Sequence, residues 1–326
     1  FLGGGIVVRA DLLNRGTATV TNSTISGNSA DFGGGIYIDI FFRPEATLTV
    51  TNSTFSSNAA TFGGGGIFNN SELIVSNSTF SGNTAATYGG GGIQSVGTLT
   101  VTNSTFLGNS GKSGGGISNL GAATSKNSII GKSPTGGNYA GTVPITAVGV
   151  NFSTDNTWAG FIQVTAQQLN LGPLQDNGGP TFTHALLPGS VAIDAITDCT
   201  DLSATPAPVT TDQRGFTRPQ DGDGNGSVVC DAGAFELQPC VITCPANITQ
   251  ANDTGRCGAV VNYGDVGCGT VTCSPTSGSS FPVGTTTVTC SEPGGATCSF
   301  TVTVNDTQPP TITCLANVTE VSAVLC

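Results

Sequence analysis

The chain has 326 residues, of which 48 are glycine and 11 are cysteine, while only 9% are charged. Soluble domains average about 7% glycine and about 25% charged residues. Threonine, serine, asparagine, valine and glycine favour strands and turns, so the composition excludes a helical fold, and the clustering of the glycines excludes collagen. The net charge of −11 argues against nucleic acid as a partner and permits divalent cations.

The first third of the chain is a repeat array. A GGGI or GGGGI phrase ends at Ile6, Ile36, Ile67, Ile93 and Ile117. A second phrase of the type TVTNSTFSGN lies between these clusters, at 19–28, 49–58, 74–83 and 100–109. Repeats of this length indicate a solenoid, and the alternation within each phrase is that of a strand.

These features predict a parallel β-helix in which each repeat is one coil of three short strands. Equivalent residues then stack in columns along the axis. The alternation predicts one interior column of Ile25, Phe55, Phe80 and Phe106, and a second interior column of Phe32, Phe62 and Tyr88. It also predicts an inward asparagine ladder formed by Asn22, Asn52, Asn77 and Asn103.

The GGGI and NSTFSGN phrases resemble the polymorphic-outer-membrane-protein type of right-handed β-helix repeat. The resemblance covers roughly residues 1–135 and implies the fold, whereas fold alone does not imply function. The fold class expected is therefore all-β, with a right-handed parallel β-helix over 1–135.

Residues 136–237 lose the strict repeat but keep a strand-forming composition. The phrases LGPLQDNGGPTFTHALLPGS, DQRG and DAGAFE resemble the bacterial family called choice-of-anchor Q. The resemblance implies the last coils and closing cap of a secreted surface protein. We expect Cys199 and Cys230, which flank the DQRG loop, to form a disulfide.

The phrase DGDGNG gives a candidate calcium loop. Asp221, Asp223 and Asn225 occupy alternate positions, and Gly226 stands sixth, as in an EF-hand loop. Position twelve is Ala232 where an EF-hand has glutamate, so Asp231 would have to close the site. The alternative is a solvated Asp/Gly turn without calcium.

Residues 238–305 resemble the hyalin repeat (HYR), an Ig-like extracellular module associated with cell adhesion. The resemblance rests on ITCPANIT, RCGAVV, VTCSPTSGSSFPVGTTTVTC and TCSFTVTV, and it implies a β-sandwich. Apart from Cys240, its six cysteines are predicted to form disulfides, with fifteen connectivities open: Cys244, Cys257, Cys268, Cys273, Cys290 and Cys298. Residues 306–326 repeat the opening of this module, so we expect an incomplete second hyalin repeat there.

Both ends of the chain fall within a repeat. This favours a piece of a longer chain, and the alternative is a fibre whose subunits join head to tail through strand edges. The dense cysteines predict an oxidising, extracellular compartment, and no apolar run is long enough to span a membrane. Five sequons outside the repeat array are candidate glycosylation sites, at Asn151, Asn247, Asn252, Asn305 and Asn317.

The acidic residues of the array do not recur at one position, and the only histidine, His184, lies in a phrase typical of the family. The sequence therefore predicts a non-catalytic structural or adhesive protein of a bacterial surface, matrix or fibre, with no catalytic residues and no cofactor other than calcium. Its partners would be copies of itself, other matrix components or polysaccharide. The competing hypothesis is a β-helix protein that binds or degrades polysaccharide, with acids and a cation converging in a groove.

Overall fold

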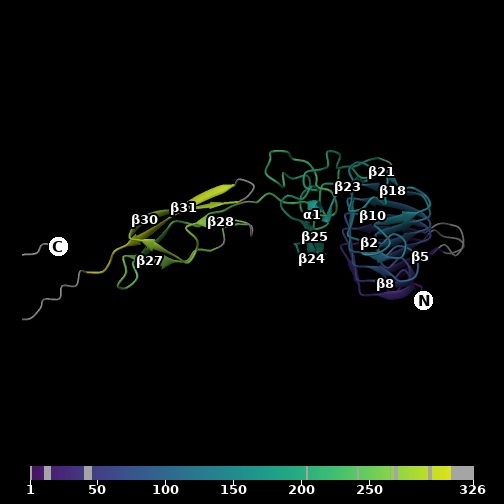
Figure 1. Cartoon of the computed structure of the whole chain (residues 1–326), viewed down its shortest axis with the longest axis horizontal. Helices are drawn as coiled ribbons and strands as arrows, with labels where there is room; N and C mark the ends of the chain where they lie inside the picture. Colours follow the sequence, from purple (N-terminus) through teal and green to yellow (C-terminus); the bar gives the residue numbers. More distant parts are fainter. Residues whose placement is uncertain are drawn as a thin grey trace, which may run out of the picture. The chain divides into compact units, whose positions relative to one another are not determined.

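The computed structural model describes residues 2–10, 16–39, 46–202, 205–240, 242–264, 266–267, 271–292 and 296–309. The chain divides into two compact units, Phe1–Pro239 and Cys240–Cys326, and both are built of β-strands (Figure 1). This division falls two residues after the expected boundary between 237 and 238.

The first unit is a β-solenoid with four short strands in a turn, where the sequence predicted three. One turn comprises β2 (Thr17–Thr21), β3 (Thr24–Ser26), β4 (Ser29–Phe32) and β5 (Ile36–Asp39). Each strand pairs in parallel with its equivalent in the next turn, in unbroken register for three of the four sheets.

The remaining strands extend these four sheets. The sheet of β5 also contains β1 (Ile6–Arg9), β9 (Ile67–Asn69), β13 (Ile93–Ser95), β17 (Ile117–Asn119) and β20 (Tyr139–Gly141). The sheet of β2 adds β6 (Thr47–Thr51), β10 (Glu72–Ser76), β14 (Thr98–Thr102), β18 (Ala123–Lys126) and β21 (Thr146–Val148). The sheet of β3 adds β7 (Thr54–Ser56), β11 (Thr79–Ser81), β15 (Thr105–Leu107), β19 (Ile129–Gly131), β22 (Phe152–Ser153) and β23 (Ile162–Gln163). The sheet of β4 adds β8 (Ala59–Gly63), β12 (Thr84–Ala85) and β16 (Ser110–Gly111).

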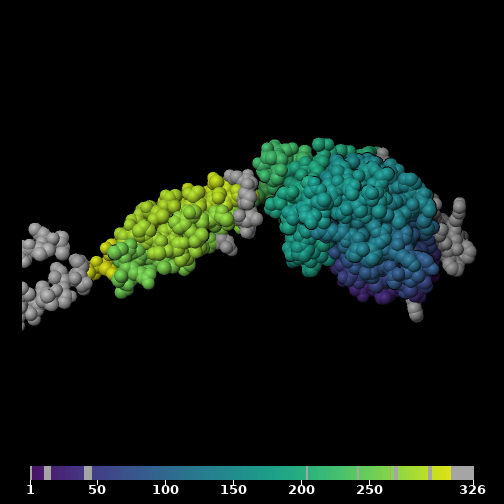
Figure 2. All heavy atoms as spheres, viewed as in Figure 1, coloured from purple at the N-terminus to yellow at the C-terminus, as the bar shows by residue number. Residues whose placement is uncertain are grey.

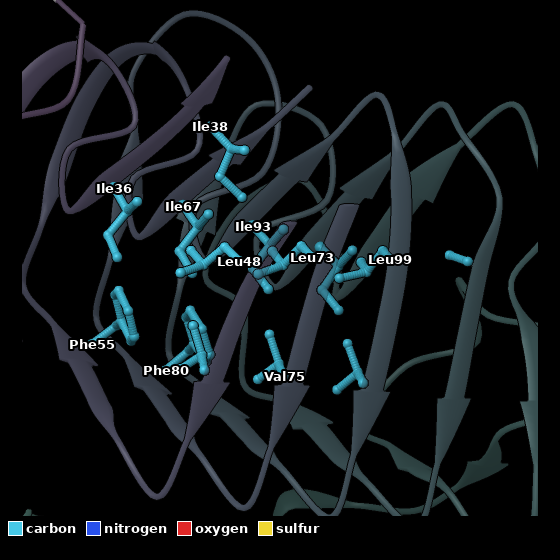
Figure 3. Close-up of a cluster of buried hydrophobic side chains, with 14 of the residues drawn as sticks. Ile36, Ile38, Leu48, Phe55, Ile67, Leu73, Val75, Phe80, Ile93 and Leu99 are labelled. Atoms are coloured by element: carbon cyan, nitrogen blue, oxygen red, sulfur yellow. The ribbon is translucent and has the colours of Figure 1, made fainter. Parts of the chain in front are cut away.

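The core of the solenoid is a set of stacked apolar columns (Figure 3). Ile25, Phe55, Phe80 and Phe106 are register partners, which confirms the first predicted interior column. The Phe55 and Phe80 rings lie 4.8 Å apart and nearly parallel, and the Phe80 and Phe106 rings lie 4.6 Å apart. These three phenylalanines are fully buried, so each contributes the full apolar area of its ring to the core.

An asparagine ladder runs through the solenoid, but it is formed by other residues than those predicted. Its members are the last asparagines of each NSTFSGN-type phrase: Asn28, Asn58, Asn83 and Asn109. The amide of Asn58 donates to Oδ1 of Asn83 at 2.9 Å and to the carbonyl of Ile25 at 2.8 Å. Asn83 bonds to Asn109 and to the Phe55 carbonyl in the same way.

The predicted ladder of Asn22, Asn52, Asn77 and Asn103 is therefore wrong. These four residues have φ between 44° and 51°, so they turn the chain at a corner between two sheets. Asparagine is one of the few side chains that tolerates this left-handed conformation. The serine that follows each of them bonds along the axis instead. The backbone N–H of Ser53 donates to Oγ of Ser78, and the backbone N–H of Ser78 donates to Oγ of Ser104.

The glycine clusters form another corner. Gly64 has φ of +66°, and a Cβ on Gly65 would lie 2.4 Å from the carbonyl oxygen of Thr84 in the next turn. Larger residues would therefore push successive turns apart.

Residues 136–237 complete the solenoid and then cover its flank. The last turns end at β23, after which come a single-turn helix α1 (Ala166–Leu169) and the antiparallel pair β24 (Leu171–Gln175) and β25 (Thr183–Leu186). Leu107 and Ile129 of the β3 sheet share a second apolar core with Leu169, Ile196 and Phe235. The segment after α1 therefore packs against the outer face of that sheet, where the teal and blue surfaces meet in Figure 2.

The second unit contains two small sheets that enclose their own core. The first, mixed sheet has the order β26 (Ile248–Ala251), β31 (Thr297–Asn305), β30 (Gly284–Ser291) and β28 (Thr272–Ser274). The second pairs β27 (Gly258–Val261) with β29 (Ser279–Pro282). Phe281, Val288 and Phe300 lie in the core between the strands of both sheets, as expected for a sandwich. Most of the predicted second repeat, 310–326, lies outside the described residues.

Candidate functional site

The DQRG and DAGAFE phrases build a buried network of charged side chains. Arg218 and Glu236 are fully buried, and Nε of Arg218 lies 2.8 Å from the Glu236 carboxylate. Nη2 of Arg214 lies 2.7 Å from the Asp212 carboxylate, and its guanidinium lies over the rings of Phe216 and Phe235. Burial lowers the pKa of Arg214. Such a network holds the segment in one arrangement, because breaking one pair would leave a buried charge without a partner.

Asp231 belongs to this network. Its carboxylate accepts hydrogen bonds from the backbone N–H groups of Asp194 and Leu237. Burial, together with the nearby Glu236 carboxylate, raises the pKa of Asp231 to about 8. The Asp231 side chain therefore lies in the interior of the fold and not in the acidic loop around Asp221 and Asp223.

Gln213 connects the network to the solenoid. Its amide nitrogen donates to Oγ1 of Thr54 at 2.8 Å, and its amide oxygen accepts from Oγ1 of Thr79 at 2.6 Å. In the next turn, Oγ1 of Thr105 accepts from the backbone N–H of Ala234. The threonines of the NSTFSGN phrases thus form a row of hydrogen-bonding groups to which the DQRG and DAGAFE segments attach.

The acidic loop brings together a set of carboxylates different from the predicted one. Ligand oxygens of Asp194, Asp221 and Asp223 lie within 4.8 Å of one another. Burial is the largest cause that raises the pKa of Asp194 to about 6. Oδ1 of Asp221 is buried and has no hydrogen-bond partner among the described residues, whereas its Oδ2 accepts from the backbone N–H of Gly226.

Two of the predicted calcium ligands do not point into this cluster. Oδ1 of Asn225 accepts from the Ser227 backbone N–H, and its amide donates to Asp223. Asp231 lies in the buried network described above, so its assignment as a ligand was wrong.

The Cys199–Cys230 disulfide and the bridge between Ile196 and Cys230 place Asp194 beside the loop. The expected disulfide was the signal in the sequence that could have identified Asp194.

The disulfides resolve part of the open connectivity. The structure joins Cys199 to Cys230, as expected, and pairs Cys244 with Cys298 and Cys273 with Cys290. The last pair consists of directly opposed residues on β28 and β30. A cluster of sulfur atoms from Cys244, Cys290 and Cys298 is explained by these bonds.

The expectation that Cys257 is bonded is wrong, because it is an exposed free thiol just before β27. Cys240, for which no pairing was predicted, is disulfide-bonded. Cys268 lies outside the described residues.

The candidate glycosylation sites differ in exposure. Asn151 is buried, and its Oδ1 accepts from the Ser128 backbone N–H, so a glycan there is excluded. Asn247 and Asn305 are exposed, whereas the amide of Asn252 donates to the Arg256 carbonyl. Asn317 lies outside the described residues.

Charged groups of the solenoid are mostly tied into structural contacts. Arg9 pairs with Asp39 in the next turn at 3.0 Å, and Lys126 pairs with Asp198 at 2.9 Å. The ring nitrogens of the buried His184 lie 2.8 Å from the Gly172 carbonyl oxygen and 3.0 Å from Oγ of Ser81. Burial lowers its pKa, so the imidazole is neutral at pH 7 and connects β25 to β11.

The predicted second interior column lies on the outside of the solenoid. Phe32 and Phe62 are half-buried, and Tyr88 is 64% exposed. Ala30 and Ala60 are buried on the strands of Phe32 and Phe62, and Ala85 is buried on β12, which ends before Tyr88. The register between β4 and β8 shifts between Ala30 and Phe32, so the strict alternation is lost before Phe32.

Comparison with known proteins supports the β-helix fold and shows distant sequence similarity to a curated protein. Residues 3–152 match the right-handed β-helix region. The chain is 33% identical over 131 residues to Hyalin of Strongylocentrotus purpuratus, and this match covers 35% of the chain and 11% of Hyalin. No solved structure matches the chain significantly. Among the described residues, no helix has the length and apolar character needed to cross a membrane. The chain thus contains a right-handed β-helix region and has distant similarity to Hyalin.

Proposed function

We propose that this chain is a non-catalytic, extracellular structural or adhesive protein of a bacterial surface, matrix or fibre. The observation that carries the proposal is the structural role of the DQRG and DAGAFE motifs. DQRG and DAGAFE, which have the acids and arginines a catalytic centre would need, hold a segment against the solenoid flank. The disulfides between described cysteines and the distant similarity to Hyalin support an oxidising, extracellular location.

Two measurements test this proposal. When the whole chain is incubated with a panel of neutral and acidic polysaccharides, we expect no release of new reducing ends. Expressed with a secretion signal, the chain should be recovered outside the cell with Cys199 bonded to Cys230. Steady turnover of any polysaccharide, or retention of the reduced chain inside the cell, would overturn the corresponding part of the proposal.

We also propose that Asp194, Asp221 and Asp223 bind calcium. The buried Oδ1 of Asp221, which lacks a partner in the described part of the chain, supports this assignment because calcium takes carboxylate oxygens as ligands. Calcium at about 1 mM, where extracellular sites fill, should raise the melting temperature of chelator-treated protein. The rise should disappear in D223N and persist in D176N, which changes an exposed aspartate outside the cluster. An equal rise in both variants, or none in the wild type, would contradict the site.

A further inference from the structure

The outward aromatic rings form one wall of a groove on the solenoid surface. The groove has a volume of about 510 Å³, and its lining includes Phe62, Phe68, Tyr88, Gln94, Lys112 and Ser118. It follows the glycine corner between the β4 and β5 sheets, so its floor contains Gly63 and Gly89. A Cβ on Gly89 would lie 2.0 Å from Oε1 of Gln94, so the groove depends on a glycine at that position.

The aromatic rings succeed one another from turn to turn. The centroids of Phe32 and Phe62 lie 5.1 Å apart, and those of Phe62 and Tyr88 lie 6.3 Å apart. Across the corner, the ring of Phe68 lies 5.1 Å from that of Phe32 in an edge-on arrangement. The groove therefore has exposed ring surface repeated along the solenoid axis, which suits a ligand that is itself a chain of flat apolar faces.

Two nearly buried polar groups open into the same groove. Gln94 is only 6% exposed; its Oε1 accepts from the Gly90 backbone N–H, and its amide nitrogen has no hydrogen-bond partner among the described residues. The hydroxyl of Ser118, which is 4% exposed, likewise has no partner in the described part of the chain. Neither polar atom is fully enclosed by the protein, so both are open to water or to a ligand in the groove.

The described lining of the groove also carries a positive charge. Lys112 lines it and is exposed, and it makes no ion pair within the described ranges. No aspartate or glutamate is among the lining residues that the structure describes. The described lining thus contributes one positive charge in a protein whose net charge is −11.

We propose that this groove binds an acidic oligosaccharide. Sugar rings combine apolar faces, which stack on Tyr88 and Phe62, with hydroxyl groups that bond Gln94 and Ser118, and a uronate carboxylate pairs with Lys112. The inference deepens the proposed adhesive function by giving it a ligand class. Adhesion between copies of the chain does not depend on oligosaccharide binding, so failure of the groove to bind would leave the proposed adhesive function intact.

Calorimetric titration of the whole chain with tetragalacturonate tests the inference. We expect saturable binding, with cellotetraose as a neutral probe of the same length binding more weakly. Tyr88→Ala should weaken tetragalacturonate binding about tenfold. Lys112→Gln should weaken it about threefold and remove the preference over cellotetraose.

Phe182→Ala is the matched control, because Phe182 is a half-exposed aromatic ring outside the groove. Its binding should equal that of the wild type. Trp158 fluorescence shows that each variant is folded, since this buried residue is the only tryptophan in the chain. Absence of saturable tetragalacturonate binding, or equal binding by the wild type and both groove variants, would overturn the inference.

Discussion

The asparagine ladder gives a sharp test of how the repeats specify the fold. We consider the same substitution, asparagine to glycine, at Asn83 in the ladder and at Asn52 at the left-handed corner. Because the change in the unfolded chain is similar at both positions, the difference in stability reports the folded-state role of each amide.

The expected cost at Asn83 follows from the bonds its side chain makes. Oδ1 accepts from the backbone N–H of Asn58 at 3.1 Å and from its amide at 2.9 Å, and Asn58 is fully buried. Two buried donors therefore lose their acceptor, and each such loss costs about 1–3 kcal/mol. N83G should lower the free energy of unfolding by about 2–6 kcal/mol.

Asn52 should respond differently. Its φ of 51° suits glycine, and its Oδ1 has no hydrogen-bond partner within the ranges that the structure describes. N52G should therefore change the free energy of unfolding by less than about 1 kcal/mol. Urea denaturation followed by Trp158 fluorescence and far-UV circular dichroism measures both variants. A cost at Asn52 equal to or greater than that at Asn83 would refute the assignment of the ladder.

Three further predictions concern the core, the buried acids and the free thiol. Phe80→Ala should cost about 3–5 kcal/mol, because the ring is fully buried between two others, whereas the exposed Phe182→Ala should cost less than about 1 kcal/mol in the same urea assay. Asp231 has a folded pKa of about 8, above its unfolded value of about 3.9, so the folded state binds more protons between these pH values. The urea midpoint of the solenoid should therefore fall as pH rises from about 5 to about 8, and the fall should be smaller in D231N; equal slopes would contradict the raised pKa. Among the described cysteines, only Cys257 should react with maleimide in the native protein, as peptide mass mapping would show; labelling at Cys273 would contradict the disulfide assignment.

The repeated phrases predicted the solenoid and its phenylalanine column because period-two alternation and a fixed repeat place Phe55, Phe80 and Phe106 on one face. The same periodicity could not identify the ladder. Asn52 and Asn58 recur with an identical spacing, and only the backbone conformation shows which amide points inward. Phe62 was placed inside because the alternation hides a register shift.

The acidic loop is a site that the sequence predicted only in part. Alternate aspartates predicted a cluster around Asp221 and Asp223, and the structure brings these two together. The third member, Asp194, is distant in sequence and reaches the loop through the Cys199–Cys230 region. Asp231 was assigned to the loop by spacing alone, but the buried Arg218–Glu236 pair draws it into the interior. Long-range contacts of this kind have no local signal.

Retention of coated beads under flow tests the adhesive function most directly. Beads bearing the whole chain, and albumin-coated beads as control, are passed over surfaces coated with the same chain or with an acidic polysaccharide. The proposed function predicts that the chain-coated beads stay attached to at least one of these surfaces at shear that removes the control beads. Equal loss of both kinds of bead from both surfaces would contradict it.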